Sequence, residues 1–174
     1  MNAPISMARL PVDELVAHIS SGDVSPGAGA AGTVALALAA ACACKAALVS
    51  LKHRPDDVEL QSAVATFTRI ARSALSDAER DSEAFEAFIR QKDPAAVDRL
   101  VCEGENVAHL IAALATAIDA IEARIRPNMT GDLIAARALS QVRGAIAGAL
   151  PGSVGVMLTW SFVMVALPVI TTLP

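Results

Sequence analysis

The chain has 174 residues, of which 54% are hydrophobic and 3% aromatic, and its mean hydropathy is +0.50. That length fits one domain (residues 1–174) with a full core. Alanine, which favours closely packed helices, supplies much of the apolar content, and the scarcity of aromatic residues argues against a β-sandwich or barrel. A net charge of −4 without a basic stripe argues against nucleic-acid binding. We therefore expect an all-α protein.

The N-terminus and the cysteines indicate a cytoplasmic protein. Acidic residues come early, and the first 20 residues lack the apolar core of a signal peptide. The three cysteines are Cys42, Cys44 and Cys102. Because Cys42 and Cys44 lie two apart in a helical stretch, they face different directions and cannot easily bridge. We expect buried free thiols in a reducing compartment rather than a metal or redox site.

The first half of the chain predicts three helices. Residues 11–20 form a short amphipathic helix. Residues 33–51 are uncharged except for Lys45, which is typical of a central bundle helix that is apolar on every side. After a basic turn and a proline, residues 56–90 place apolar side chains at three- and four-residue steps, which predicts a long amphipathic helix.

The second half predicts helices at residues 95–125 and 130–150, followed by an apolar end. Residues 144–174 carry no formal charge, and within them residues 153–167 predict one further helix, which Pro168 ends. A membrane-spanning helix needs about 20 apolar residues. Because this run is shorter, we favour a buried or dimer-packing helix, while a membrane anchor stays open as the alternative.

A glycine-rich segment, SPGAGAAG, begins at Ser25 and leads into the second helix. It lacks the spacing of a phosphate-binding loop, and no strand precedes it. We predict Ser25 as the helix N-cap and Pro26 as a first-turn residue. Small residues here favour close packing against a neighbour. Backbone amides at a helix start can also hold an anion or a planar ligand.

Several charged residues have both an ordinary and a functional interpretation. Lys52, His53 and Arg54 at a helix end suit the helix dipole, or they could dock a carboxylate or a polyanionic tail. Asp81 borders the apolar face of its helix rather than opposing it.

The segment RPNMTGD offers capping residues at a helix start. Asn128 or Thr130 can serve as N-cap, with Asp132 in the first turn. An acid at such a junction can also transfer protons where the loop lines a cleft. The three histidines are far apart, so a histidine-based metal site is not expected.

Taken in order, SPGAGAAG, LKHRP, DSEAF and NMTGD resemble the motifs of the formiminotransferase-cyclodeaminase domain family, which includes bacterial methenyltetrahydrofolate cyclohydrolases. The similarity spans about residues 12–150. The positions that match the family's motifs are Ser25, Pro26, Gly27, Gly29, Lys52, Arg54, Asp81, Glu83, Ala84, Phe85, Asn128 and Asp132. The positions that depart from them include Ala28, His53, Pro55 and Gly131, and the polar residues of the family's N-V-R-I-N segment are absent near residues 150–154.

The resemblance implies an antiparallel helix bundle that forms homodimers and binds folate in a cleft lined by these motifs. It implies chemistry on the one-carbon bridge between N5 and N10 of tetrahydrofolate, without a metal. By resemblance, Asp132 transfers protons, Asp81 contacts or orients the substrate, and Lys52 is an electrostatic partner. The implied substrate-binding residues are Ser25, Pro26, Gly27, Gly29, Arg54, Phe85 and Asn128.

Three hypotheses follow. The protein is a folate cyclohydrolase or cyclodeaminase, or an enzyme of the same fold redirected to another small molecule. The third hypothesis is a non-catalytic helical protein whose apolar tail binds a partner or a membrane. A functional site should bring Asp81, Asp132 and Lys52 together at one cavity.

Overall fold

The structure, a computed structural model, describes residues 6–93 and 95–147, the last five of these by their backbone alone. Every regular element in this part is helical, which confirms the predicted all-α class. The α-helices are α1 (Val12–Ile19), α2 (Ala28–Leu51), α3 (Val58–Gln91), α4 (Ala95–Ile121) and α5 (Thr130–Ala147). The 3-10 helices are η1 (Met7–Arg9), η2 (Glu122–Arg124) and η3 (Pro127–Met129). The helix predicted at residues 153–167 lies outside the described residues.

The start of α2 differs from the prediction. The helix begins at Ala28, five residues before the predicted start, and its N-cap is Gly27 rather than Ser25. The glycines that suggested a loop are tolerated in the first turns because this part of α2 packs tightly: Ala30 and Gly32 are buried. Packing therefore outweighs the low helix propensity of glycine.

The ends of α3 follow local rules. Asp57 is its N-cap, and its side chain accepts a hydrogen bond from the backbone N–H of Leu60 at 3.1 Å. At the other end Lys92 adopts a left-handed conformation with φ 52°, which closes the helix in the way that glycine more often does.

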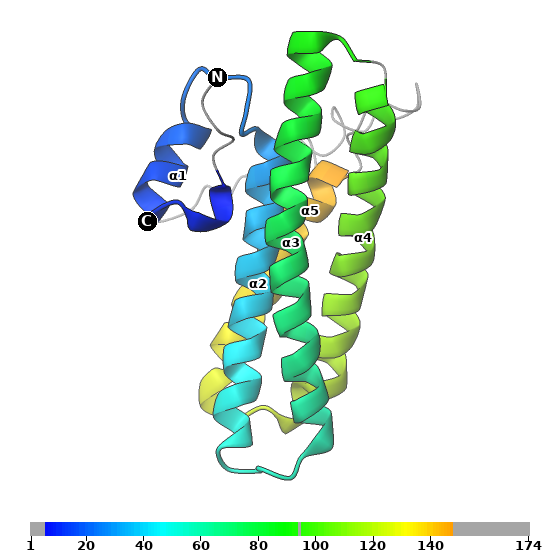
Figure 1. Cartoon of the computed structure of the whole chain (residues 1–174). Helices are drawn as coiled ribbons and strands as arrows, with labels where there is room; N and C mark the ends of the chain where they lie inside the picture. Colours follow the sequence, from blue (N-terminus) through cyan, green and yellow to red (C-terminus); the bar gives the residue numbers. More distant parts are fainter. Residues whose placement is uncertain (1–5, 94, 148–174) are drawn as a thin grey trace, which may run out of the picture.

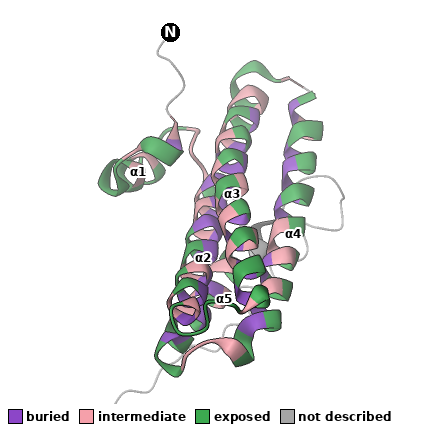
Figure 2. Cartoon of the chain, turned by 60° about the horizontal axis from the view of Figure 1, so that its bottom comes forward, coloured by how far each residue is buried: buried purple, intermediate pink, exposed green. Residues whose placement is uncertain are grey.

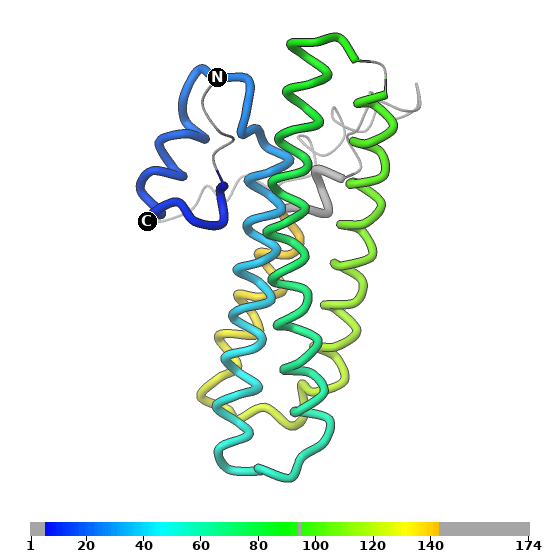
Figure 3. The backbone as a smooth tube through the Cα atoms, viewed as in Figure 1, coloured from blue at the N-terminus to red at the C-terminus, as the bar shows by residue number. Residues whose placement is uncertain are grey.

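The four long helices lie side by side, and the chain reverses direction between successive helices, whereas α1 stands to one side (Figure 1). The smooth backbone trace shows the same course (Figure 3). Helix α2 packs against both α3 and α5, and α4 packs mainly on α3. This arrangement places the glycine-rich start of α2 beside the later part of α3, and the later part of α2 beside the start of α5.

The core lies between these helices, where the buried residues face one another (Figure 2). Helix α2 contributes mostly alanines to it, and these let α3 and α5 approach closely. The large side chains come mainly from the other helices. The fully buried ones include Phe67, Ile70, Leu114 and Ile118.

Two helices of the described part, Ala28–Leu51 and Ala95–Arg124, are long and apolar enough to cross a membrane. Length and composition alone are weak evidence, because the core helix of a soluble protein passes the same test. About 44% of the apolar window of the first is buried inside the protein, against 22% for the second.

Candidate functional site

The residues predicted to form the site gather at two places along α2. Gly29 marks the first place and Lys45 the second, 16 residues further on. At 1.5 Å per residue, these two places are about 24 Å apart along the helix axis.

At the first place, α2 touches the side chain of Asp81. A Cβ atom added to Gly29 would lie 2.8 Å from Oδ1 and 2.9 Å from Cγ of Asp81, closer than real side chains come. The Asp81 side chain is 7% exposed. The sequence predicted both residues as site positions. The structure shows that the carboxyl group of Asp81 on α3 occupies the space of a Cβ atom at Gly29, so a larger residue there would force the Asp81 side chain to move.

The turn before α2 is tied to α3 at the same level. The hydroxyl of Ser25 donates to the backbone carbonyl of Ser82 at 3.4 Å, so this side chain holds the turn against α3 instead of capping α2. Pro26 follows through a cis peptide bond. Phe85, one turn after Asp81, is 36% exposed at the end of this region.

Beside Asp81 lies a charge network that the sequence analysis did not predict. Arg80 donates through Nε to Oε1 of Glu103 at 2.8 Å and also pairs with Asp77. The hydrogen bond to Glu103 raises the pKa of Arg80 above its ordinary value, although burial opposes it. Asp77 and Glu103 are both buried, and Oε2 of Glu103 is buried without a hydrogen-bond partner among the described residues. The sequence shows only scattered charges, and the packing of α3 on α4 brings them together.

At the second place, Lys45 of α2 pairs with Asp132 of α5. Their Nζ and Oδ1 atoms are 3.4 Å apart, and the side chain of Asp132 is 23% exposed. Sequence reasoning gave Asp132 a functional role but treated Lys45 only as an exception in an apolar helix. The available signal was that Lys45 is the only charged residue within α2.

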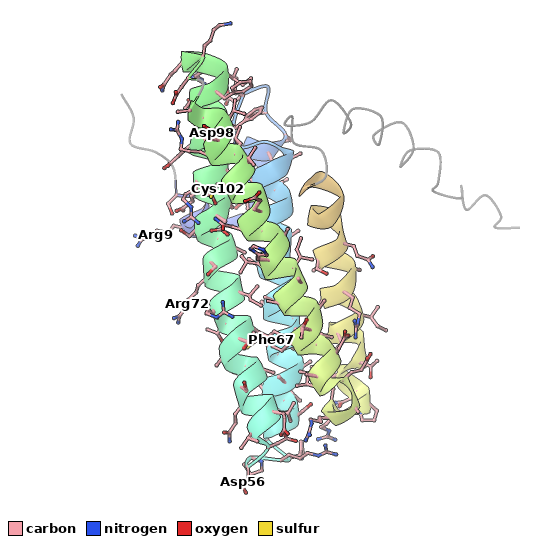
Figure 4. All side chains as sticks on the ribbon, turned by 90° about the vertical axis from the view of Figure 1, so that its right-hand side faces the viewer. Arg9, Asp56, Phe67, Arg72, Asp98 and Cys102 are labelled. Atoms are coloured by element: carbon pink, nitrogen blue, oxygen red, sulfur yellow. The ribbon has the colours of Figure 1, made fainter. Side chains whose placement is uncertain are left out.

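Lys45 also borders an open groove of about 890 Å³ between α2 and α3. Its walls are mainly apolar, and Lys45 and Lys52 are its two charged residues. Phe67 is one of its lining residues and is fully buried within the bundle (Figure 4). The groove is lined by Ala41, Cys44, Lys45, Leu48, Val49, Leu51, Lys52, Pro55, Gln61, Phe67, Thr68 and Ala71. Lys52 lies two turns beyond Lys45 on the same side of α2.

The remaining predicted residues lie at the end of the molecule that Asp56 marks in Figure 4. Lys52 is the C-cap of α2, and Arg54 follows it in an exposed turn. Asn128 is exposed in η3. Next to them Arg126 contacts Nε2 of His53, and its backbone N–H donates to the hydroxyl of Ser50 at 3.1 Å.

Comparison with models of known protein families decides which family this chain belongs to. The model of the formiminotransferase-cyclodeaminase family matches residues 11–98, which is half of the chain. The chain belongs to the formiminotransferase-cyclodeaminase family. A comparison with curated proteins finds no match. The suspected family is therefore confirmed, and with it a folate-related, one-carbon setting.

The family match covers α1, α2, α3 and the first residues of α4. Gly29, Asp81, Lys45 and the groove lie inside it. Asn128 and Asp132 follow it, so their assignment rests on the resemblance of the NMTGD segment and on the contact with Lys45.

Asp81 and Asp132 are not brought to one cavity within a single chain of this family member. Asp81 lies at the level of Gly29, and Asp132 at the level of Lys45. Lys52 is not the cation that contacts Asp132 in the ion pair, because Lys45 takes that position. Among the described residues, no three side chains of His, Cys, Asp or Glu form a group that could hold a metal ion.

Proposed function

We propose that this protein is a folate-dependent one-carbon enzyme that acts on the N5/N10 bridge of tetrahydrofolate, as a cyclohydrolase or a cyclodeaminase. The observation that carries this proposal is the Lys45–Asp132 ion pair beside the α2–α3 groove. The pair combines a proton acceptor with a positive charge next to an open, mainly apolar space, within a chain of the folate-related family.

Asp132 is the proposed proton-transfer residue. In hydrolysis of a methenyl bridge, its carboxylate takes a proton from the attacking water as the new C–O bond forms. The C–N bond to one folate nitrogen then breaks: that nitrogen keeps the electron pair and takes the proton back from Asp132, while the hydroxyl group of the intermediate releases its proton to solvent as the formyl C=O forms. In a cyclodeaminase, N10 attacks the formimino carbon and the bond from that carbon to the formimino nitrogen breaks. The protonated acid and N10 each supply one proton, so the formimino nitrogen leaves as ammonia and the ring closes to the methenyl form. Both reactions need one side chain that can accept a proton and donate it again beside the reacting carbon.

The groove is the proposed binding site for the ring system of the folate. Its apolar walls suit planar aromatic rings, and such pockets commonly combine apolar walls with a few polar groups. Lys52 lies on its rim and Arg54 follows two residues later. These cations suit the carboxylates of the glutamate portion. We place the reaction in the cytoplasm.

We further propose that the protein works as an antiparallel helix bundle in a homodimer. Asp81 and Asp132 are too far apart in one chain to touch the same reacting group. A twofold pairing in which α2 of one copy runs against α2 of the other would set the Gly29–Asp81 end of one copy near the Lys45–Asp132 end of the other. In this arrangement Asp81 orients a substrate on which Asp132 of the partner subunit acts.

The test is a tetrahydrofolate binding titration, followed by a methenyltetrahydrofolate hydrolysis assay and a formiminotetrahydrofolate deamination assay. We expect saturable binding and a rate above the spontaneous one that depends on Asp132. Absence of both tetrahydrofolate binding and either activity would reject the proposal.

A further inference from the structure

An uncovered apolar surface runs along the outer side of α5. On α5 it consists of Ile134, Ala138 and Val142, which share one side of the helix at four-residue steps. Ile134 is 64% exposed and Val142 50% exposed, and Leu38 of the adjacent α2 is 55% exposed. We call Ile134, Ala138 and Val142 the α5 outer face. Large apolar side chains this exposed along one side of a helix commonly mark a surface that something covers.

The charged residues described on α5 leave this face uncharged. Asp132 pairs with Lys45 of α2, and Arg137 pairs with Asp119 of α4 and Glu122 of η2. Both charges are therefore turned toward neighbouring helices. A polar partner would find no charge to bind on the α5 outer face, whereas an uncharged apolar segment would bury it without leaving a charge unpaired.

The chain itself carries such a segment directly after α5. Residues 144–174 contain no charged side chain, and Pro151 and Gly152 stand just before the apolar run of residues 153–167. The connection from Ala147 to residue 153 has the length of ordinary helix–helix connections. Fifteen residues of helix span about 22 Å, close to the length of α5 between Asp132 and Ala147.

We propose that residues 153–167 fold back as a helix on the α5 outer face of the same chain, antiparallel to α5, and that Pro168 ends this helix near Asp132. The chain would then place Trp160 at the level of Ala138 and Val142, because Trp160 lies seven residues into the segment. The docked segment would also cover one side of the Lys45–Asp132 pair. This inference does not depend on the folate chemistry.

Trp160 is the only tryptophan and the chain has no tyrosine, so its fluorescence reports on this segment alone. We would measure the emission and the acrylamide quenching of Trp160 in the full chain, in Val142→Asp and in Ile134→Asp. The matched control is Val12→Asp, which places the same charge on α1 at a side chain that is 77% exposed. Far-UV circular dichroism would confirm that each variant keeps its helix content.

The proposal expects blue-shifted emission and weak quenching in the parent chain, unchanged on dilution to the monomer. It expects a red shift and several-fold stronger quenching in Val142→Asp, a smaller change in Ile134→Asp, and no change in Val12→Asp. Water-exposed emission in the parent chain overturns the proposal, as does emission that neither substitution on α5 alters.

Two further outcomes assign the segment to another occupant and also overturn the proposal. Quenching of Trp160 by phosphatidylcholine vesicles with brominated acyl chains, without an effect of Val142→Asp, indicates a membrane-bound segment. Loss of protection on dilution, in step with dimer dissociation in light scattering, indicates that the segment packs on a second copy.

Discussion

The ammonium group of Lys45 lies 3.4 Å from a carboxylate oxygen of Asp132, and this contact joins α2 to α5 beside the groove. Because α2 is otherwise uncharged, the contact brings a single cation of this helix to Asp132, the proposed proton-transfer residue.

Asp132→Asn is expected to lower the hydrolysis or deamination rate by about 10²- to 10⁴-fold, the range that general acid–base catalysis contributes. Lys45→Gln should lower it by only about fivefold, because an exposed ion pair is worth about 1 kcal/mol or less. Steady-state kinetics on both variants and on Asp98→Asn, a control at an exposed acid of α4, would measure this. Equal rates in Asp132→Asn and the control would remove Asp132 from the mechanism.

Gly29→Ala is expected to destabilise the fold by about 1–3 kcal/mol, the usual cost of inserting a methyl group into a packed site. The new Cβ would meet Asp81 at distances under 3.0 Å, so the buried carboxyl group would have to move. Gly131→Ala is the matched control, because nothing lies within 4 Å of a Cβ added there. In urea denaturation the control should be neutral or slightly stabilised. A stable Gly29→Ala with unchanged binding would show that the close approach is not needed.

The homodimer proposal predicts complementation between two inactive variants. Asp81→Asn and Asp132→Asn should each be inactive as pure proteins. After the two are mixed under conditions that exchange subunits, about a quarter of the parent activity should return, because half of the dimers contain one intact composite site out of two. Recovery of no activity from a mixture whose heterodimers are confirmed by native mass spectrometry would place each site within one chain.

The lowered pKa of Asp57 predicts how the stability of the fold decreases in acid. Burial raises the pKa of Asp57, but the backbone N–H of Leu60 and the guanidinium of Arg124 lower it by more, so the folded-state pKa lies below the ordinary value. A lowered folded-state pKa means that the stabilisation is fully present above the ordinary value of 3.8 and is lost as the pH falls through the folded value.

Asp57→Asn keeps an N-cap side chain and removes the charge. Its melting temperature should therefore be lower than that of the parent chain at pH 7, and the difference should shrink below pH 4. Asp56→Asn, at an exposed neighbouring acid, is the control and should leave the melting temperature unchanged both at pH 7 and below pH 4. A difference that stays constant down to pH 2 would contradict this account.

Arg80 is predicted to be more important for stability than its exposed position suggests. Arg80→Met leaves the buried carboxyl groups of Asp77 and Glu103 without their shared cation. Loss of one partner from a buried pair costs about 3–5 kcal/mol. Because the Arg80 side chain is 46% exposed, solvent screening reduces this to about 1–2 kcal/mol. Glu103→Gln, which also removes a charge but keeps a similar shape, should cost less in the same urea denaturation.

The helices were predictable from the sequence because their signals are local. Spacing of apolar residues and Asp57 before a helical run place α3 within two residues of its observed start, and the alanine content of residues 33–51 predicted a central helix. The motif order also led to the family, since motif residues and their spacing are properties of the chain alone. The early start of α2 was missed, because glycine has low helix propensity and only its packing against α3 overrides this preference.

The grouping of the site residues was decided by tertiary structure. Residue spacing shows that Gly29 and Lys45 lie on one helix. It does not show that the Asp81 side chain packs against Gly29, or that Asp132 pairs with Lys45. Those contacts depend on the positions of α3 and α5 along the axis of α2, and long-range packing sets these positions. The same packing joins Arg80 to Glu103 on the next helix. It also separates Asp81 from Asp132, because charges distant in sequence meet only where neighbouring helices place them at the same level.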